Sequence, residues 1–357
     1  MKLNFIRLHN FRNIEFADIQ LDDNSIWIFG KNAQGKTNLL EAIGLLNAIR
    51  SFRTTSTEAL IRQGQSEAQI LAQVQTQKFG EVEIQLNIGA NKEIFVDSQK
   101  LTKLGEYLGK FPVLAITNED TKLLRGSPEV RRKDMDMFIS SLDKTYFESL
   151  RHYHKALSQR NSLLRAQSND FSLYNAFEQE MAQSAQVILK HRKEKLKQLG
   201  NIASNKYQIL VDQNPEQAEI NLKPNCDISS ADEFLDVLQH NRKSDLEKRS
   251  TQKGIHRDDF KIFIDNKDAK LYASEGQQKS AVIAIRLAQF DMICTYLQES
   301  PVIICDDILG ELDVDRKSRF WQCIDTKTQV IATATELPSE NFLRTWKTIN
   351  VNSGTFK

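Results

Sequence analysis

The sequence is poor in the residues that dominate irregular or cross-linked folds. Its 357 residues include only six prolines, fourteen glycines and four cysteines. These counts exclude a collagen-like chain, a low-complexity disordered chain and a small disulfide-stapled domain. No cysteine belongs to a C-x-x-C pair, and three stand in apolar stretches; the four are Cys226, Cys294, Cys305 and Cys323. We therefore expect free thiols and a reducing, cytoplasmic location.

Long hydrophobic runs and an excess of one charge are also missing. No apolar stretch approaches the roughly 20 residues that cross a bilayer, and no apolar signal core follows the N-terminus, so we expect no membrane association. Lys and Arg number 48 against 47 Asp and Glu. This balance neither requires nor excludes a nucleic-acid partner, which only a clustered basic face would indicate. Apolar residues make up 40% of the chain, enough for a substantial core.

The hydrophobic patterns divide the chain into three parts. Apolar or alternating runs predict strands at 3–8, 14–21, 25–29, 68–97, 111–116, 259–264, 301–306 and 329–333. The middle of the chain is mostly helical, beginning with Ser127 as N-cap and Pro128 as the first helical residue. We expect an α/β fold in which residues 1–125 and 254–357 form one mixed sheet with flanking helices. Residues 126–253 would form an inserted, mostly α-helical lobe.

The segment after the strand at 25–29 matches G-x-x-x-x-G-K-[ST] at every fixed position. It consists of Gly30, Lys31, Asn32, Ala33, Gln34, Gly35, Lys36 and Thr37. The glycines let backbone N–H groups turn toward phosphates, and the following helix adds its positive end. Lys36 would reach the β and γ phosphates of ATP, and the Thr37 hydroxyl would ligate Mg²⁺. A fortuitous Gly/Lys-rich turn is the alternative; the flanking strand and helix favour nucleotide binding.

A second apolar strand, at 301–306, ends in two carboxylates. Asp306, at the carboxyl end of a strand beside the P-loop strand, would hold Mg²⁺ directly or through water. Asp307 would then orient or deprotonate the attacking water. Strands often end in acidic turns, so this pair is informative only because the chain also carries a P-loop. Together the two motifs predict ATP hydrolysis.

Two further segments resemble motifs of ABC-type ATPases. A Ser-x-Gly-Gln sequence at the start of a predicted helix resembles the signature motif, with Ser274, Gly276 and Gln277 as its contact residues. Just after the acidic pair, Glu311 and Asp313 resemble the D-loop. In ABC-type ATPases the signature of one subunit closes over the γ-phosphate held by the other, so ATP joins a two-fold dimer. The alternative for Ser274 is an ordinary N-cap.

With these motifs, nearly the whole chain resembles the RecF family, ABC-type ATPases related to the heads of SMC and Rad50 proteins. The resemblance rests on Leu8-His9-Asn10-Phe11-Arg12-Asn13, the P-loop and its helix to Ala42, Ser51-Phe52-Arg53-Thr54, Gly126-Ser127-Pro128, Arg131-Arg132, Gln159-Arg160-Asn161 and His256-Arg257-Asp258-Asp259. It implies an ATPase head formed by 1–125 and 254–357, with 126–253 as a helical arm. It also implies an ATP-dependent homodimeric clamp on double-stranded or gapped DNA, with RecR and RecO as partners in loading RecA and a part in SOS induction.

The resemblance assigns roles to further residues. Arg53 would contact the nucleotide, and Asn118 would approach the metal, where ABC proteins use a Gln. Thr333 stands where ABC transporters place a His after the last strand. Without that His, and with Asp rather than Glu at position 307, we expect slow, DNA-stimulated hydrolysis, which suits a timed clamp better than a motor.

Basic residues of the helical part supply the expected DNA surface. The candidates are Arg131, Arg132, Lys190, Arg192 and Lys193. A charge run on a helix is more often a solvated face than a binding site, so these residues are candidates only together with the family resemblance. The sequence shows no interleaving of aromatic and basic residues for base stacking. We therefore expect contacts to the phosphates of duplex DNA, dependent on salt and independent of base sequence.

Two other functions fit part of the sequence. Another DNA-associated ABC-type ATPase would share the nucleotide chemistry, but such proteins usually carry a long coiled coil or a nuclease domain, for which the chain has no room. A P-loop kinase acting on a small molecule would be monomeric and carry a lid rich in arginine. The kinase alternative leaves the Ser-x-Gly-Gln sequence at 274–277 unexplained.

Overall fold

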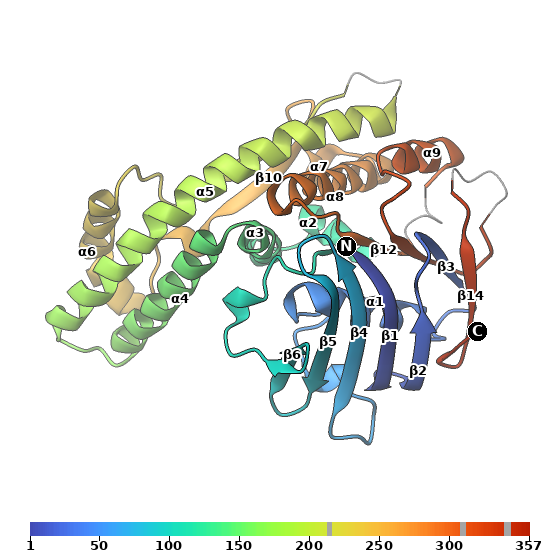
Figure 1. Ribbon diagram of the computed structural model, residues 1–357. Helices are drawn as coiled ribbons and strands as arrows, with labels where there is room; N and C mark the ends of the chain where they lie inside the picture. The colour runs from blue at the N-terminus through green and yellow to red at the C-terminus, as the bar shows by residue number, and fades with distance from the viewer. Residues whose placement is uncertain (213–215, 308–311, 339–343) are drawn as a thin grey trace. The chain divides into compact units, whose positions relative to one another are not determined.

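A computed structural model describes residues 1–212, 216–307, 312–338 and 344–357 (Figure 1). The chain forms two compact units, which we call the head unit and the arm unit. The head unit comprises Met1–Asp120, Lys206–Asn214 and Ile283–Lys357, and the arm unit comprises Thr121–Asn205 and Pro215–Val282. In this division the segment 254–282 falls in the arm unit. The domain boundaries at 125 and 253 remain a prediction from the sequence.

The alternating strands of the head unit form an antiparallel sheet in the order β2-β1-β4-β5-β6-β7 (Figure 1). Its strands are β1 (Lys2–Phe11), β2 (Ile14–Gln20), β4 (Ala68–Thr76), β5 (Gly80–Ile88), β6 (Lys92–Val96) and β7 (Gln99–Lys100). Along β4 and β5, every second residue is buried, because one face of the sheet covers the core. The period of two in the sequence therefore predicted both the strands and their buried face.

A second sheet of the head unit has the order β15-β14-β3-β13-β12-β8. Its strands are β3 (Ser25–Phe29), β8 (Val113–Thr117), β12 (Val302–Asp306), β13 (Val330–Ala334), β14 (Lys347–Asn352) and β15 (Thr355–Phe356). All neighbours from β14 to β8 pair in parallel, so their carboxyl ends meet at one edge of the sheet. The expected single sheet was wrong. The strands β3, β12 and β13, which are buried on both faces, lie at the centre of this parallel sheet, whereas β4 and β5, each buried on one face, belong to the antiparallel sheet.

Helix α1 (Lys36–Ala48) belongs to the core of the head unit. Its apolar residues at the predicted helical spacing are all buried, namely Leu39, Leu40, Ile43 and Leu46. Shorter elements of this unit are η1 (Glu58–Leu60), η2 (Leu104–Glu106), η3 (Asn118–Thr121, its last residue in the arm unit) and α9 (Val314–Gln322). The α/β class predicted from the sequence is confirmed by these two sheets and their helices.

Helix α8 (Glu275–Leu297) is, within the described part of the chain, the one helix long and apolar enough to cross a membrane. Its most apolar 18-residue window has a mean hydropathy of 1.3, so the expectation that no stretch approaches this length was wrong. Of that window, 72% is buried inside the protein. Such burial is usual for the core helix of a soluble protein, and it accounts for the apolar composition of α8.

The arm unit is mainly helical. Its helices are α2 (Lys122–Arg125), α3 (Pro128–Leu142), α4 (Lys144–Arg165), α5 (Phe171–Val211, its last residues in the head unit), α6 (Ala231–Lys248) and α7 (Ala269–Tyr272), with the short turn η4 (Ile255–Arg257). Ser127 is the N-cap of α3 and Pro128 its first residue, as predicted. Helices α4 and α5 run antiparallel, because contacts pair Arg160 with Glu178 and Tyr146 with Arg192.

A small antiparallel sheet completes the arm unit. It has the order β11-β10-β9, formed by β9 (Ala218–Lys223), β10 (Asp259–Ile264) and β11 (Lys267–Asp268). The sequence predicted β10 as a strand but assigned it to the sheet of the head segments. That assignment was wrong, because β10 pairs along its whole length with β9.

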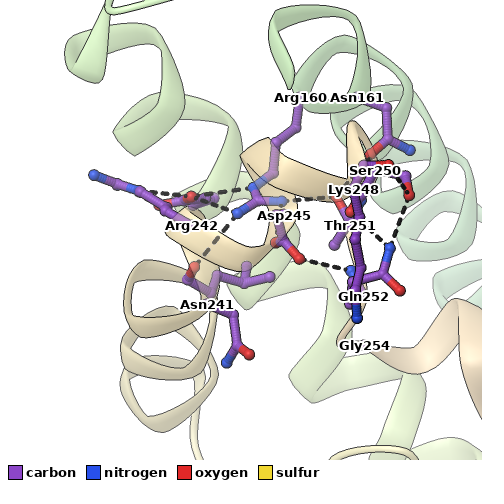
Figure 2. A network of polar contacts seen from close by, with 12 residues as sticks. Arg160, Asn161, Asn241, Arg242, Asp245, Lys248, Ser250, Thr251, Gln252 and Gly254 are labelled. Atoms are coloured by element: carbon purple, nitrogen blue, oxygen red, sulfur yellow. Dashed lines mark hydrogen bonds and ion pairs between the residues drawn. The ribbon is translucent and has the colours of Figure 1, made fainter. Parts of the chain in front are cut away.

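A polar network, largely buried, joins α4, α5 and α6 (Figure 2). Arg160 donates hydrogen bonds to Asp245 at 2.8 Å, to Thr251 at 2.7 Å and to Glu178 at 3.1 Å. Arg242 also binds Glu178, with its Nε 2.9 Å from a carboxylate oxygen. Two cations thus meet two carboxylates, and burial of these charges is tolerated because each has a partner. The network fixes how the three helices of the arm pack.

Replacing Arg160 by methionine should lower the free energy of unfolding by about 3–5 kcal/mol, because Asp245 would remain buried without a cation. Arg242→Met is the matched control. Its side chain is 18% exposed and Glu178 would keep Arg160 as a partner, so we expect a loss of about 1 kcal/mol. Urea denaturation followed by far-ultraviolet circular dichroism measures both. Equal losses in the two variants would contradict the central role of Arg160.

Candidate functional site

The phosphate loop connects β3 to α1 through a turn that requires glycine at two positions. Gly30 has a φ of 151°, and a Cβ there would lie 2.5 Å from the carbonyl oxygen of Val351 on β14. Gly35 has a φ of 116°, and a Cβ there would lie 3.2 Å from the side-chain oxygen of Asn13. Both fixed glycines of the motif therefore have a physical cause in this fold: backbone conformation and lack of space.

Side chains of the loop hold it in this turn. The Lys36 ammonium donates to the carbonyl oxygens of Gly30 at 2.6 Å and Lys31 at 3.1 Å. The carbonyl of Gln34 accepts a hydrogen bond from the backbone N–H of Gly354 at 2.9 Å, which ties the loop to the turn after β14. The outer residues of the loop are exposed to solvent; they are Lys31, Asn32 and Ala33.

The first turn of α1 is open to an anion. Its N-cap, Gly35, supplies no side-chain hydrogen bond, and no acidic residue stands in the first turn. The first N–H groups of a helix have no partner within the helix and carry the positive end of its dipole. Lys36 adds a full positive charge at the same end. This arrangement suits a polyphosphate chain.

The acidic strand β12 meets the P-loop helix through a hydroxyl group. The sequence suggested that β12 lies directly beside β3, but β13 lies between them. Even so, the Thr37 hydroxyl donates to Oδ1 of Asp306 at 2.9 Å. The motif residues from two distant parts of the sequence are therefore brought together at the carboxyl edge of the parallel sheet.

Thr333, at the carboxyl end of β13, holds both acidic residues. Its hydroxyl donates to Oδ1 of Asp306 at 2.9 Å and accepts the backbone N–H of Asp307 at 3.1 Å. Asp307 has a φ of 52°, in the left-handed region that costs energy for a residue with a side chain. The side chain of Thr333 thus fixes the position of the carboxylate at 306 and the backbone at 307.

The donor set around Asp306 fits Mg²⁺. Burial raises the pKa of Asp306, whereas the hydrogen bonds from Thr333 and Thr37 and the positive charge of Arg53 lower it. A carboxylate beside a hydroxyl provides the hard oxygen ligands that Mg²⁺ combines with phosphate oxygens. Thr37 and Asp306 would hold the ion, which would neutralise charge on the phosphates. Asn118 follows β8, whose last residue pairs with Asp306, so the chain brings position 118 to the same sheet edge.

The signature residues lie in the arm unit, at the start of α8. Ser274 is exposed; its hydroxyl accepts the backbone N–H of Gln277 at 3.3 Å, and its own N–H donates to the Gln277 side chain at 2.8 Å. This reciprocal capping box is the alternative function that the sequence allowed for Ser274. Gln277 also binds Glu216, at 2.9 Å. Gly276, between them, is half-buried. The capping of α8 within one chain thus accounts for the Ser-x-x-Gln spacing. A contact of Ser274 with nucleotide stays a prediction.

The D-loop residues are described in part. Asp313 caps α9, because its carboxylate accepts the backbone N–H of Arg316 at 2.8 Å. Glu311 lies outside the described residues, so its predicted role stays a prediction.

Two of the five proposed DNA contacts are wrong, because their side chains are buried in ion pairs. Arg192 is 1% exposed and binds Asp136 and Asp258, while Arg131 is 8% exposed and binds Asp259. Two separate basic runs, at 131–133 and 190–197, favoured a surface position for these side chains, but the helical period turns Arg131 and Arg192 toward the core. Arg132 is half-buried, and Lys190 and Lys193 are exposed, so a contact of these three with DNA stays a prediction.

Comparisons with known proteins fit this geometry. The family model described as RecF/RecN/SMC N terminal domain matches residues 2–353. A DNA replication and repair protein RecF of Clostridium perfringens is 36% identical over 325 residues, covering 89% of this chain and 88% of the relative. The RecF of Leptospira interrogans is 34% identical and covers 94% of this chain and 92% of its own. The chain belongs to the RecF family.

Solved structures support the same relationship. A structure described as the recombination mediator protein RecF with ATP, in the RecFOR pathway, has a TM-score of 0.91 and 30% identity; the match covers 100% of this chain and 97% of that one. An SMC head domain of Pyrococcus furiosus has a TM-score of 0.52 at 15% identity, which shows a shared head fold and no more. The predicted family and the ABC-type head are therefore confirmed.

Two residues of the site escaped the sequence reasoning. Arg12, which belongs to a segment typical of the RecF family, and Glu41, on the P-loop helix, form a bidentate ion pair at 2.7–2.8 Å. Glu41 is completely buried, and Arg53 also reaches it, at 3.2 Å. A charged residue between Leu40 and Ala42 on a core helix was the available signal, since buried carboxylates require partners.

Replacing Thr333 by valine should slow ATP hydrolysis about tenfold, with little change in ATP affinity. The variant keeps the shape of the side chain but removes the hydroxyl that holds the acidic pair, at a cost of about 1–3 kcal/mol in stability. Phosphate release under saturating ATP measures the rate. Thr335→Val, an exposed threonine two residues further on, is the control. Hydrolysis by Thr333→Val at the rate of the control would contradict the positioning role.

Proposed function

We propose that the protein is an ATP-dependent DNA-binding clamp of the RecF type that acts in DNA replication and repair. The observation that carries the proposal is the junction of Thr37 with Asp306, 2.9 Å apart beneath an open helix N-terminus. A phosphate loop with glycines at its required positions, next to a carboxylate that can bind Mg²⁺, is typical of a site for a nucleoside triphosphate. The likeness to a RecF structure with ATP supports the choice of ATP.

The chemistry proposed is slow hydrolysis assisted by Mg²⁺. Lys36 and the α1 N–H groups would bind the phosphates, and Thr37 and Asp306, with Asn118 nearby, would hold the ion. Asp307 would orient the attacking water, and Thr333 would fix Asp307 in place. Because an Asp replaces the usual Glu as base and a Thr replaces the His, hydrolysis would be slow, and DNA would stimulate it.

A second copy of the chain would complete the nucleotide site. Ser274 is exposed at the N-terminus of α8, where a helix end and a hydroxyl are available to a phosphate from outside. Gly276, Gln277, Glu311 and Asp313 would belong to the same interface. ATP would thus hold a two-fold dimer together, and hydrolysis would release it.

DNA would contact cations of the arm unit, namely the exposed Lys190 and Lys193 and the half-buried Arg132. Such contacts bind backbone phosphates and give little base specificity, which suits duplex or gapped DNA. RecR, and through it RecO, would be partners, as the RecFOR pathway named for the similar structure suggests. A cytoplasmic location and a part in recombination and SOS induction complete the proposal.

ATP should convert the protein from monomer to dimer, and Ser274→Arg should abolish this conversion while leaving ATP binding intact. The large cation would block the interface but lies outside the P-loop. Sedimentation velocity with and without ATP measures the mass, and equilibrium titration measures ATP binding. Lys36→Arg is a second variant, which keeps the charge but alters its geometry and should slow hydrolysis. A wild type that stays monomeric with saturating ATP at micromolar concentration would refute the clamp.

Replacing Lys190 and Lys193 together by glutamine should weaken duplex binding and lower the slope of log K against log salt by about 2. The cause is the loss of two phosphate contacts. The control replaces two exposed head lysines, Lys78 and Lys103, in the same way. Fluorescence anisotropy over a salt series measures both. An unchanged salt slope in the arm variant would remove these lysines from the DNA surface.

A further inference from the structure

A buried carboxylate on α1 binds guanidinium groups from two other segments of the head unit. The side chain of Glu41 has no exposed surface. Arg12, in the turn between β1 and β2, donates to both of its oxygens, at 2.8 Å and 2.7 Å. Arg53, in the loop after α1, donates from Nη1 to Oε2 at 3.2 Å. One carboxylate therefore joins the first turn of the chain, the P-loop helix and the loop that follows it.

Glu41 also fixes the backbone that carries Arg53. The Ser51 hydroxyl donates to Glu41 and accepts the backbone N–H groups of Arg53 at 2.9 Å and Thr54 at 3.0 Å. Glu41 thus holds Arg53 at two points. It binds the guanidinium directly, and it fixes the backbone of Arg53 through the Ser51 hydroxyl. A long, flexible cation is pre-organised in this way, which reduces the entropy lost when it binds an anion.

The held guanidinium lies beside the first turn of α1. Nη1 of Arg53 also donates to the side chain of Asn38 at 2.9 Å, and Asn38 is the third residue of the helix. The Arg53 side chain is 37% exposed, and its Nε and Nη2 bind no group among the described residues. The remaining donors are therefore available at the end of α1 that is open to an anion.

The charges of the three side chains do not cancel. Two guanidinium groups at +1 each and one carboxylate at −1 leave a net charge of +1. Without Arg12, the carboxylate would neutralise Arg53, and the pair would attract a polyphosphate far less. Arg12 already binds both oxygens of Glu41, so Arg12 is the cation that compensates the carboxylate.

We infer that Glu41 and Arg12 are positioning residues for Arg53: Glu41 orients its guanidinium, and Arg12 compensates Glu41 so that Arg53 keeps its positive charge for the phosphates of the nucleotide. This inference rests on the proposed function, in which the phosphates of ATP bind at the start of α1. It assigns to Arg12 an effect that acts through Arg53 and needs no contact of Arg12 with ATP.

The test is a pair of variants, Arg12→Gln and the double variant Arg12→Gln with Glu41→Gln. Arg12→Gln should weaken ATP binding about tenfold, because Glu41 would then neutralise Arg53. The double variant removes the carboxylate as well, so no neighbouring negative charge offsets the guanidinium of Arg53. ATP affinity should then return to within about threefold of the wild type. Isothermal titration calorimetry with ATP and Mg²⁺ measures the affinities, at a temperature where circular dichroism shows every variant folded.

Arg7→Gln is the matched control, because Arg7 lies on β1, shortly before Arg12, and binds Asp18 in the same bidentate manner on the sheet surface. It should bind ATP like the wild type. If Arg12 instead contacts the nucleotide directly, the double variant stays as weak as Arg12→Gln, and the inference is wrong. Unchanged affinity in Arg12→Gln would also overturn it. A wild type that binds no ATP would refute the proposed function itself, so the two failures are distinguishable.

Discussion

The hydrogen bond between Thr37 and Asp306 is the contact on which the site depends. It joins residue 37 to residue 306, across an intervening strand of the sheet. Parallel pairing makes this possible, because the strands β3, β13, β12 and β8 all end at one edge of the sheet. The phosphate loop, the acidic pair and Thr333 lie close together because the strands that carry them end at that common edge. The antiparallel sheet places Arg12, in the turn between β1 and β2, against the P-loop helix.

Most of the strands and the P-loop could be predicted from the sequence because their signals are local. The Gly30 and Gly35 positions are dictated by backbone conformation, and the helix that follows shows its apolar period directly. Strand pairing is different. Periodicity gives the buried face of a strand but not its neighbour, so the assignment of β10 to the head sheet and of β12 to the side of β3 failed.

Charged side chains were the least predictable part. Arg192 and Arg131 stand in basic runs that favour a surface, yet each lies in a buried ion pair. Glu41 is likewise a charged residue that is buried in an ion pair, here on an apolar helix. A buried charge is stable only with a partner, and the partner is usually distant in sequence. Which charged residues are buried therefore depends on the tertiary fold, and the pattern of residues along the sequence does not reveal it.

The central claim is that each ATP site is built from two copies of the chain. Complementation between two inactive variants tests it most directly. Lys36→Ala would lack a working phosphate loop and Ser274→Ala would lack the signature hydroxyl, so each alone should hydrolyse little ATP. In the mixture, a mixed dimer has one site with both parts intact, and hydrolysis should reappear. A mixture as inactive as its components, or Ser274→Ala alone at the wild-type rate, would contradict the shared site.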